Sequence, residues 1–109
     1  MNDMVTEVRG WFDAAQAMQA DTVALRRAIH AEPELGLQTP KTLAKVRAAL
    51  AGLPLEWKTG PSTTGAVAVL RGAKPGRTVL LRGDMDALPM REDTGLPFGS
   101  KVEGTMHAC

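Results

Sequence analysis

The sequence of 109 residues contains no tyrosine, one cysteine and two histidines, and only 4% of its residues are aromatic. A single cysteine excludes an internal disulfide framework and suits a reducing compartment, so we expect a cytoplasmic protein. The scarcity of aromatic side chains argues against a surface that stacks nucleic-acid bases. With a formal net charge of +1, the chain also lacks the positive charge that attracts nucleic acids or anionic membranes.

Long apolar runs are missing as well. No stretch approaches the roughly 18 apolar residues that a membrane helix needs. A signal peptide begins with positive charge followed by an apolar run, whereas this chain begins with the acidic residues Asp3 and Glu7 and has no such run. This argues against a signal peptide. The composition, 44% hydrophobic and 23% charged, is typical of a soluble globular protein. Because no linker or repeat divides the chain, we expect residues 1–109 to belong to a single α/β domain.

Apolar residues recur at helical spacing in three segments, residues 4–19, 21–32 and 39–53. The third segment has the clearest boundaries. Thr39 is the predicted N-cap and Pro40 suits the first helical position. Gly52 is the predicted left-handed residue at the end of this helix, and Pro54 prevents its continuation.

The pattern changes from helical to extended after the third helix. Residues 55–59 form a possible short strand, and residues 65–72 and 77–84 are rich in apolar and β-branched side chains. The turn sequence Ala-Lys-Pro-Gly between the last two segments predicts that they form a hairpin. After Leu88, glycine and proline become frequent and indicate loops. The sequence therefore predicts helices followed by a β-hairpin of a mixed sheet.

The segment VLLRGDMDALP, residues 79–89, leads from an apolar strand into Asp84 and Asp86. Ligands of open α/β sheets gather beyond the carboxyl ends of strands. Carboxylates two residues apart on an extended chain point to the same side. They can share a cation, or one can orient a metal ligand while the other stays free. The alternative is a solvated turn with two exposed acids.

The last six residues, GTMHAC, place His107 beside Cys109, and imidazole and thiolate are both good zinc ligands. Two alternatives remain open. The segment can be an ordinary polar loop with a free thiol, or Cys109 can be a nucleophile paired with His107, although this spacing rarely permits their mutual hydrogen bond. In the segment RRAIHAEPELG, we expect a structural role for His30, because a histidine near a helix C-terminus interacts favourably with the helix dipole.

Four stretches together resemble one enzyme family. LRRAIHAEPELGLQTPKT, TTGAVAVLRG, LLRGDMDALPM and GTMHAC occur in the order found in the N-terminal part of M20-type amidohydrolases, in the hippurate hydrolase and N-acyl-amino-acid hydrolase branch. The resemblance implies a catalytic α/β domain with an inserted second domain that often dimerises, so the intact parent is expected to be a homodimer. It implies cleavage of the amide bond of small N-acyl amino acids with two divalent metal ions, zinc or manganese.

The same resemblance implies roles for individual residues. Cys109 matches the first ligand of a metal-binding motif that continues in the family as Gly-His-Asp. Asp86 matches an acid that orients a metal-site residue. Asp84 and His107 lie near the expected site, and their roles stay open. Because the family's other ligands and its general-base glutamate have no counterpart here, the chain alone is expected to be an inactive N-terminal portion of the catalytic domain, lacking the second domain.

Two glutamates, Glu92 and Glu103, lie in loops outside the family's motifs, and neither is expected to be the general base. A sheet cut midway would also expose an edge, so we expect the chain to fold poorly by itself. Two other functions are weighed. The pair Asp84 and Asp86 resembles the nucleophile motif of magnesium-dependent haloacid-dehalogenase-type phosphatases, but Ala87 and Leu88 replace the Gly-Thr that normally follows. A small non-enzymatic binding domain is the other alternative.

Overall fold

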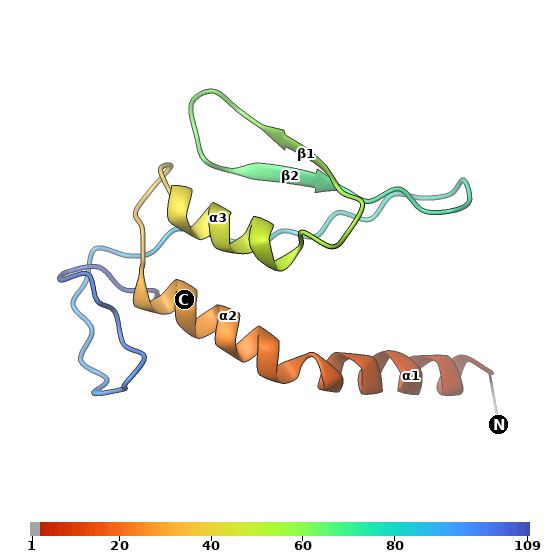
Figure 1. Cartoon of the computed structure of the whole chain (residues 1–109), viewed down its shortest axis with the longest axis horizontal. Coiled ribbons are helices and arrows are strands. Elements are labelled where there is room, and N and C mark those ends of the chain that lie inside the picture. The colour runs from red at the N-terminus through yellow and green to blue at the C-terminus, as the bar shows by residue number, and fades with distance from the viewer. Residues whose placement is uncertain (1–2) are drawn as a thin grey trace.

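The computed structural model describes residues 3–109 and contains three helices and two short strands. In chain order these are α1 (Asp3–Ala17), α2 (Gln19–Ala31), α3 (Pro40–Ala49), β1 (Glu56–Thr59) and β2 (Ala66–Val69). Helices α1 and α2 follow each other along the length of the molecule, and α3 lies between α2 and the hairpin (Figure 1). The expected order, helices followed by a β-hairpin, is confirmed.

The apolar stripe of α1 lies at the surface. Val5, Val8 and Phe12 share one face of the helix, as their spacing predicts, yet each is more than half exposed. Among the described elements α1 packs mainly against α2. Its stripe therefore contributes little to a core within residues 3–109.

The start of α3 is stabilised by a side chain that the sequence did not indicate. Thr39 occupies the N-cap position as expected, but its side chain makes no capping hydrogen bond. Glu34 does the capping instead: its carboxylate accepts hydrogen bonds from the backbone N–H groups of Lys41 and Thr42, at 3.1 and 2.6 Å. The backbone N–H and hydroxyl of Thr39 both bond to the hydroxyl of Thr64. The prediction of Thr39 as the N-cap is therefore confirmed, but the capping hydrogen bonds come from the carboxylate of Glu34.

The end of α3 also differs from its expectation. Gly52 was predicted to adopt a left-handed conformation, but among residues 3–109 only Gly36, Gly95 and Gly104 have a positive φ. The helix ends at Ala49, and the N–H of its C-cap residue, Leu50, bonds to the carbonyl groups of Val46 and Ala48.

The two strands pair antiparallel, with Glu56 opposite Val69 and Thr59 opposite Ala66. The predicted hairpin between residues 65–72 and 77–84 was therefore wrong: β2 lies in the first of these segments but pairs with β1. Long-range contacts favour this pairing. The guanidinium of Arg47 on α3 lies 4.9 Å from the ring centre of Trp57 on β1, so the helix supports β1 beside β2.

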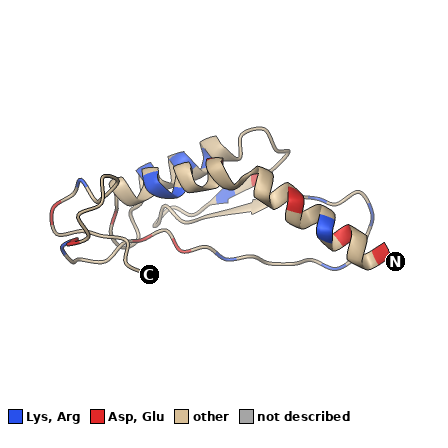
Figure 2. Ribbon diagram, turned by 90° about the horizontal axis from the view of Figure 1, so that it is seen from below, with Lys and Arg blue, Asp and Glu red and all other residues tan. Residues whose placement is uncertain are grey.

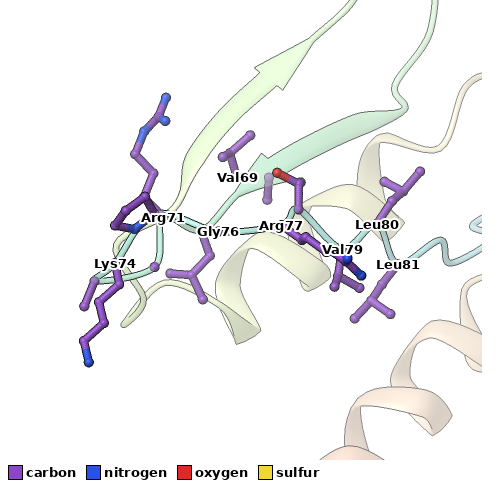
Figure 3. A pocket seen from close by; sticks show the side chains of 14 residues that line it. Val69, Arg71, Lys74, Gly76, Arg77, Val79, Leu80 and Leu81 are labelled. Carbon is purple, nitrogen blue, oxygen red and sulfur yellow. The ribbon is translucent and has the colours of Figure 1, made fainter.

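Residues 77–84 run extended along the molecule without a strand partner (Figure 1). Val79, Leu80 and Leu81 are between 81% and 89% exposed. They border an open groove of about 800 Å³ beside the end of β2 (Figure 3). A parallel bridge between Leu35 and Ala87 fixes the far end of this segment. The segment thus has the apolar character of a central strand without the neighbours of one.

Burial is slight throughout the described chain. Ala87 is the only buried hydrophobic residue among residues 3–109. The radius of gyration is 17.1 Å, against about 13 Å for a compact domain of this length. Acidic and basic residues both occur in helices and in loops (Figure 2). Within the same residues, no helix combines the length and apolar character needed to cross a membrane.

Candidate metal centre

Three segments that are distant in the sequence meet near the C-terminal end of α2. The backbone N–H of Ala87 donates to the carbonyl of Glu34 at 2.8 Å. On the other side, Leu88 and Met106 exchange two backbone hydrogen bonds, at 2.8 and 3.0 Å. This short ladder places the segment that carries Asp84 between the end of α2 and the chain's last residues.

A pocket of about 170 Å³ lies at this junction. Its lining residues are Arg26, Ile29, His30, Asp84, His107 and Cys109. The structure therefore brings together three of the four residues singled out as ligands or neighbours of a metal site. Asp86, the fourth, lines an adjacent groove of about 370 Å³, which it shares with Asp84.

His107 is partly buried, and its Nε2 atom is fully enclosed with no hydrogen-bond partner. Burial lowers the pKa of His107 below its usual value and the nearby His30 lowers it further, whereas Asp86 and Asp84 act in the opposite direction. The neutral imidazole is therefore favoured. Because buried polar atoms are nearly always bonded, this nitrogen is a candidate partner for a group that enters the pocket.

The two aspartates and the cysteine are accessible to solvent. Asp84 forms a 3.6 Å ion pair with Arg82, but the two side chains are 62% and 81% exposed, so the pair holds Asp84 weakly. Asp86 is exposed, and Cys109 carries a free, exposed thiol. The enclosed Nε2 of His107 makes no hydrogen bond to Cys109, so the geometry does not support a Cys–His nucleophile pair.

Comparisons with known proteins bear on the same segments. Residues 80–109, which contain both aspartates and Cys109, match the family described as Peptidase family M20/M25/M40. N-acetylcysteine deacetylase of Bacillus subtilis is 41% identical over 97 residues. The match covers 88% of this chain and 26% of that protein. Thermostable carboxypeptidase 1 of Saccharolobus solfataricus is 48% identical over 80% of this chain and 22% of its own length.

A solved structure agrees with these relatives. A dinuclear metal binding peptidase of the M20 family from Bacillus subtilis superposes with a TM-score of 0.78 at 41% identity. The superposition covers 86% of this chain and 26% of that one. Over most of its length, the chain is similar to members of the M20 family. It spans about a quarter of the length of these relatives.

The side chains around the pocket fit part of a metal site. The thiol of Cys109, the carboxylate of Asp84 and the unpaired nitrogen of His107 border one pocket, and all three groups are common metal donors. Within residues 3–109, however, no three histidine, cysteine, aspartate or glutamate side chains are grouped closely enough to hold an ion. The pocket can therefore contribute donors to a metal centre but does not complete one.

One residue that lines the pocket, His30, belongs to a buried pair that the sequence did not predict. Nε2 of His30 lies 2.6 Å from Oε1 of Glu92, and these side chains are only 11% and 8% exposed. His30 was expected at a helix end with a structural role, but Glu92 was expected to be an ordinary loop residue. The two residues are 62 positions apart, so no local pattern could have revealed their contact.

Proposed function

We propose that residues 1–109 form the N-terminal portion of the catalytic α/β domain of a metal-dependent amidohydrolase that cleaves the amide bond of small N-acyl amino acids. The observation that carries the proposal is the shared pocket of Asp84, His107 and Cys109, in a chain similar to deacetylases and to an N-acyl-L-amino acid amidohydrolase of Geobacillus stearothermophilus. Aromatic acyl groups, as in hippurate, are the substrates we would test first.

In this proposal Cys109 is a thiolate ligand of one of two divalent ions, zinc or manganese. Metal ions in such a site activate a water molecule and stabilise the negative charge that develops on the amide oxygen. Asp86 lies next to the pocket and orients a residue of the site. Asp84 and His107 border the pocket directly, where the carboxylate and the neutral imidazole limit the shape and charge of what enters.

The remaining ligands and the general base come, in this proposal, from other parts of a larger domain. Two observations support this. The relatives are more than three times as long as this chain, and the apolar side chains of Val79, Leu80 and Leu81 have no covering partner among the described residues. Neighbouring strands would cover them. Residues 1–109 alone are then inactive and only marginally stable, because they bury almost no apolar surface.

The cellular setting follows from the same chemistry. A thiolate ligand needs a reduced cysteine, so we place the enzyme in the cytoplasm. The intact enzyme would be a homodimer joined through a second domain outside these residues, acting on a soluble small molecule.

The test uses the protein that carries this chain together with its complete catalytic domain. Metal content is measured by elemental analysis, and hydrolysis of hippurate and N-acetyl amino acids is measured by release of the free amine. We expect Cys109→Ser to lose bound metal and turnover, with Ser62→Ala, at an exposed loop position, as the control. Unchanged metal content and turnover in Cys109→Ser would overturn the proposal. Steady turnover by residues 1–109 alone would overturn the statement that they are inactive.

A further inference from the structure

The pair formed by His30 and Glu92 is a connection between α2 and the loop that leads to Cys109. His30 belongs to the last turn of α2, and its ring packs edge-on against Phe98 with the ring centres 6.4 Å apart. The ring centres of His30 and His107 are 6.5 Å apart. His30 therefore touches the loop at Glu92 and Phe98 and stands beside the candidate metal centre.

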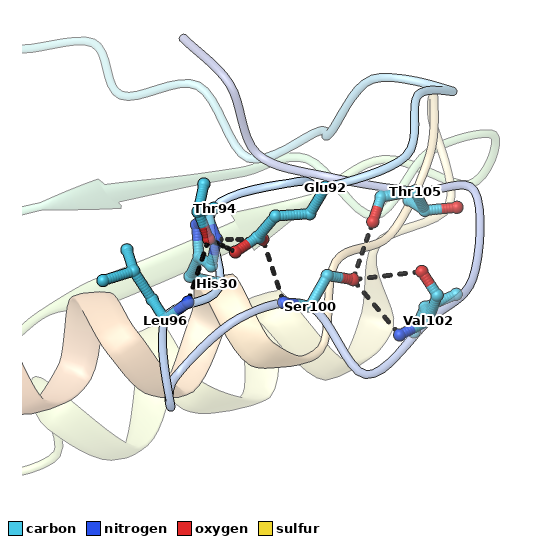
Figure 4. Close-up of polar contacts among 7 residues, drawn as sticks. All are labelled: His30, Glu92, Thr94, Leu96, Ser100, Val102 and Thr105. Atoms are coloured by element: carbon cyan, nitrogen blue, oxygen red, sulfur yellow. Dashed lines mark hydrogen bonds and ion pairs between the residues drawn. The ribbon is translucent and has the colours of Figure 1, made fainter.

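Glu92 also accepts hydrogen bonds from the turn that follows it in the chain (Figure 4). Its Oε1 atom, already bonded to His30, also accepts a hydrogen bond from the backbone N–H of Ser100 at 2.9 Å. Its Oε2 atom accepts a hydrogen bond from the hydroxyl of Thr94. A Cβ atom at Gly99 would lie only 2.7 Å from Oε2, so the carboxylate fits closely against a position where only glycine leaves room.

Ser100 forms hydrogen bonds to residues that lie shortly before Cys109. Its hydroxyl donates to the carbonyl of Thr105 at 2.7 Å and also contacts the carbonyl of Val102 at 3.0 Å. The N–H of the next residue, Lys101, bonds to the carbonyl of Ala31 at the end of α2. These bonds close residues 99–105 into a turn that is attached to α2 directly through Lys101 and indirectly through Glu92 and His30. The chain leaves this turn at Met106, directly before His107 and Cys109.

We propose that His30 and Glu92 are positioning residues for the metal-binding end of the chain. Through Ser100 and Thr105, their hydrogen bonds fix the point from which His107 and Cys109 project into the pocket. The inference rests on the proposed function, because it assumes that Cys109 binds metal. It assigns a task to Glu92 that is distinct from proton transfer, since both carboxylate oxygens are occupied by hydrogen bonds within the loop.

The test measures cobalt(II) binding to the protein that carries this chain with its complete catalytic domain. The thiolate-to-cobalt absorption band reports the bond to Cys109. We expect Glu92→Ala to raise the dissociation constant about tenfold, the usual effect of losing a group that orients a metal ligand. Glu92→Gln keeps an Oε1 acceptor for His30 and Ser100, so it should stay within about threefold of wild type. Glu103→Ala is the control, because that side chain is 90% exposed in the same loop.

Amide hydrogen exchange supplies an independent readout. The N–H of Met106, which bonds to Leu88, should exchange faster in Glu92→Ala but not in Glu103→Ala. If Glu92→Ala does not fold, His30→Leu removes the other partner of the pair and should shift both quantities in the same direction.

The outcomes separate the two proposals. Wild-type protein that binds no cobalt through its thiolate would overturn the proposed function. Wild-type binding with an unchanged dissociation constant in Glu92→Ala, or in His30→Leu if that variant is the one tested, would overturn the positioning role alone. A Glu92→Gln variant as weak as Glu92→Ala would overturn it too, because the effect would then depend on charge and not on the hydrogen bonds.

Discussion

Replacing Glu34 with alanine tests how the start of α3 is held. The carboxylate accepts hydrogen bonds from the backbone N–H and the hydroxyl of Thr42, at 2.6 and 2.8 Å, and from the N–H of Lys41 at 3.1 Å. Thr42 is only 2% exposed, so water cannot replace the carboxylate there. The N–H of Lys41 lies at an exposed position and can bond to water.

The magnitude follows from these differences in exposure. Loss of a helix-capping side chain costs roughly 0.5–2 kcal/mol, and a buried donor left without a partner costs about 1–3 kcal/mol. Because only Thr42 is left without partners, we expect Glu34→Ala to lower the free energy of unfolding by about 2 kcal/mol. The backbone carbonyl of Glu34, which bonds to Ala87, is retained in the variant.

The assay is urea unfolding followed by far-UV circular dichroism, in the protein that carries this chain. Glu32→Ala is the control: its carboxylate is 47% exposed and contacts Lys45 and Lys41 at 3.3 and 3.9 Å. Exposed ion pairs of this kind contribute about 0–1 kcal/mol. Equal losses of stability in the Glu34 and Glu32 variants would refute the assignment of Glu34 as the cap of α3.

Three further predictions concern Gly99, Thr64 and the carboxyl groups of Glu92 and Glu34. Gly99→Ala should displace the carboxylate of Glu92 and lower the melting temperature, whereas Gly76→Ala, with open space around its Cβ position, should not. Thr64→Val removes the acceptor for a buried N-cap N–H and should cost about 1–3 kcal/mol in urea unfolding. Hydrogen bonds from Thr94 and Ser100 lower the pKa of Glu92. Burial raises the pKa of Glu34, but hydrogen bonds from Thr42 and Lys41 outweigh burial, so this pKa is lowered as well. Their stabilisation should therefore be complete above about pH 4.5 and lost as pH falls through the lowered values, and acid titration of the double glutamine variant should show a smaller loss.

Local sequence signals were sufficient to predict the three helices. The three periodic segments became α1, α2 and α3 with ends shifted by only a few residues, and Pro40 begins α3 as predicted. Helical spacing reports neighbours three and four residues apart, which the chain itself brings together. The motifs that carry Asp84 and Cys109 were also recognisable without coordinates, because their residue types and order resemble one family.

Only the tertiary structure decided which strands pair and what surrounds the pocket. A turn signal at residues 73–76 favoured a hairpin that does not form: β2 pairs with β1, and α3 contacts β1 through Arg47 and Trp57. A strand's apolar pattern states that it will be buried, but not beside which strand.

The contact between His30 and Glu92 was likewise decided by the tertiary structure. It joins positions 62 residues apart, and both side chains are ordinary in their local context. The sequence by itself determined the helices, the family resemblance and the residue types available for metal binding. The tertiary structure decided the strand pairing, the capping of α3 and the anchoring of the loop before Cys109, because each depends on groups that meet only after the chain has folded.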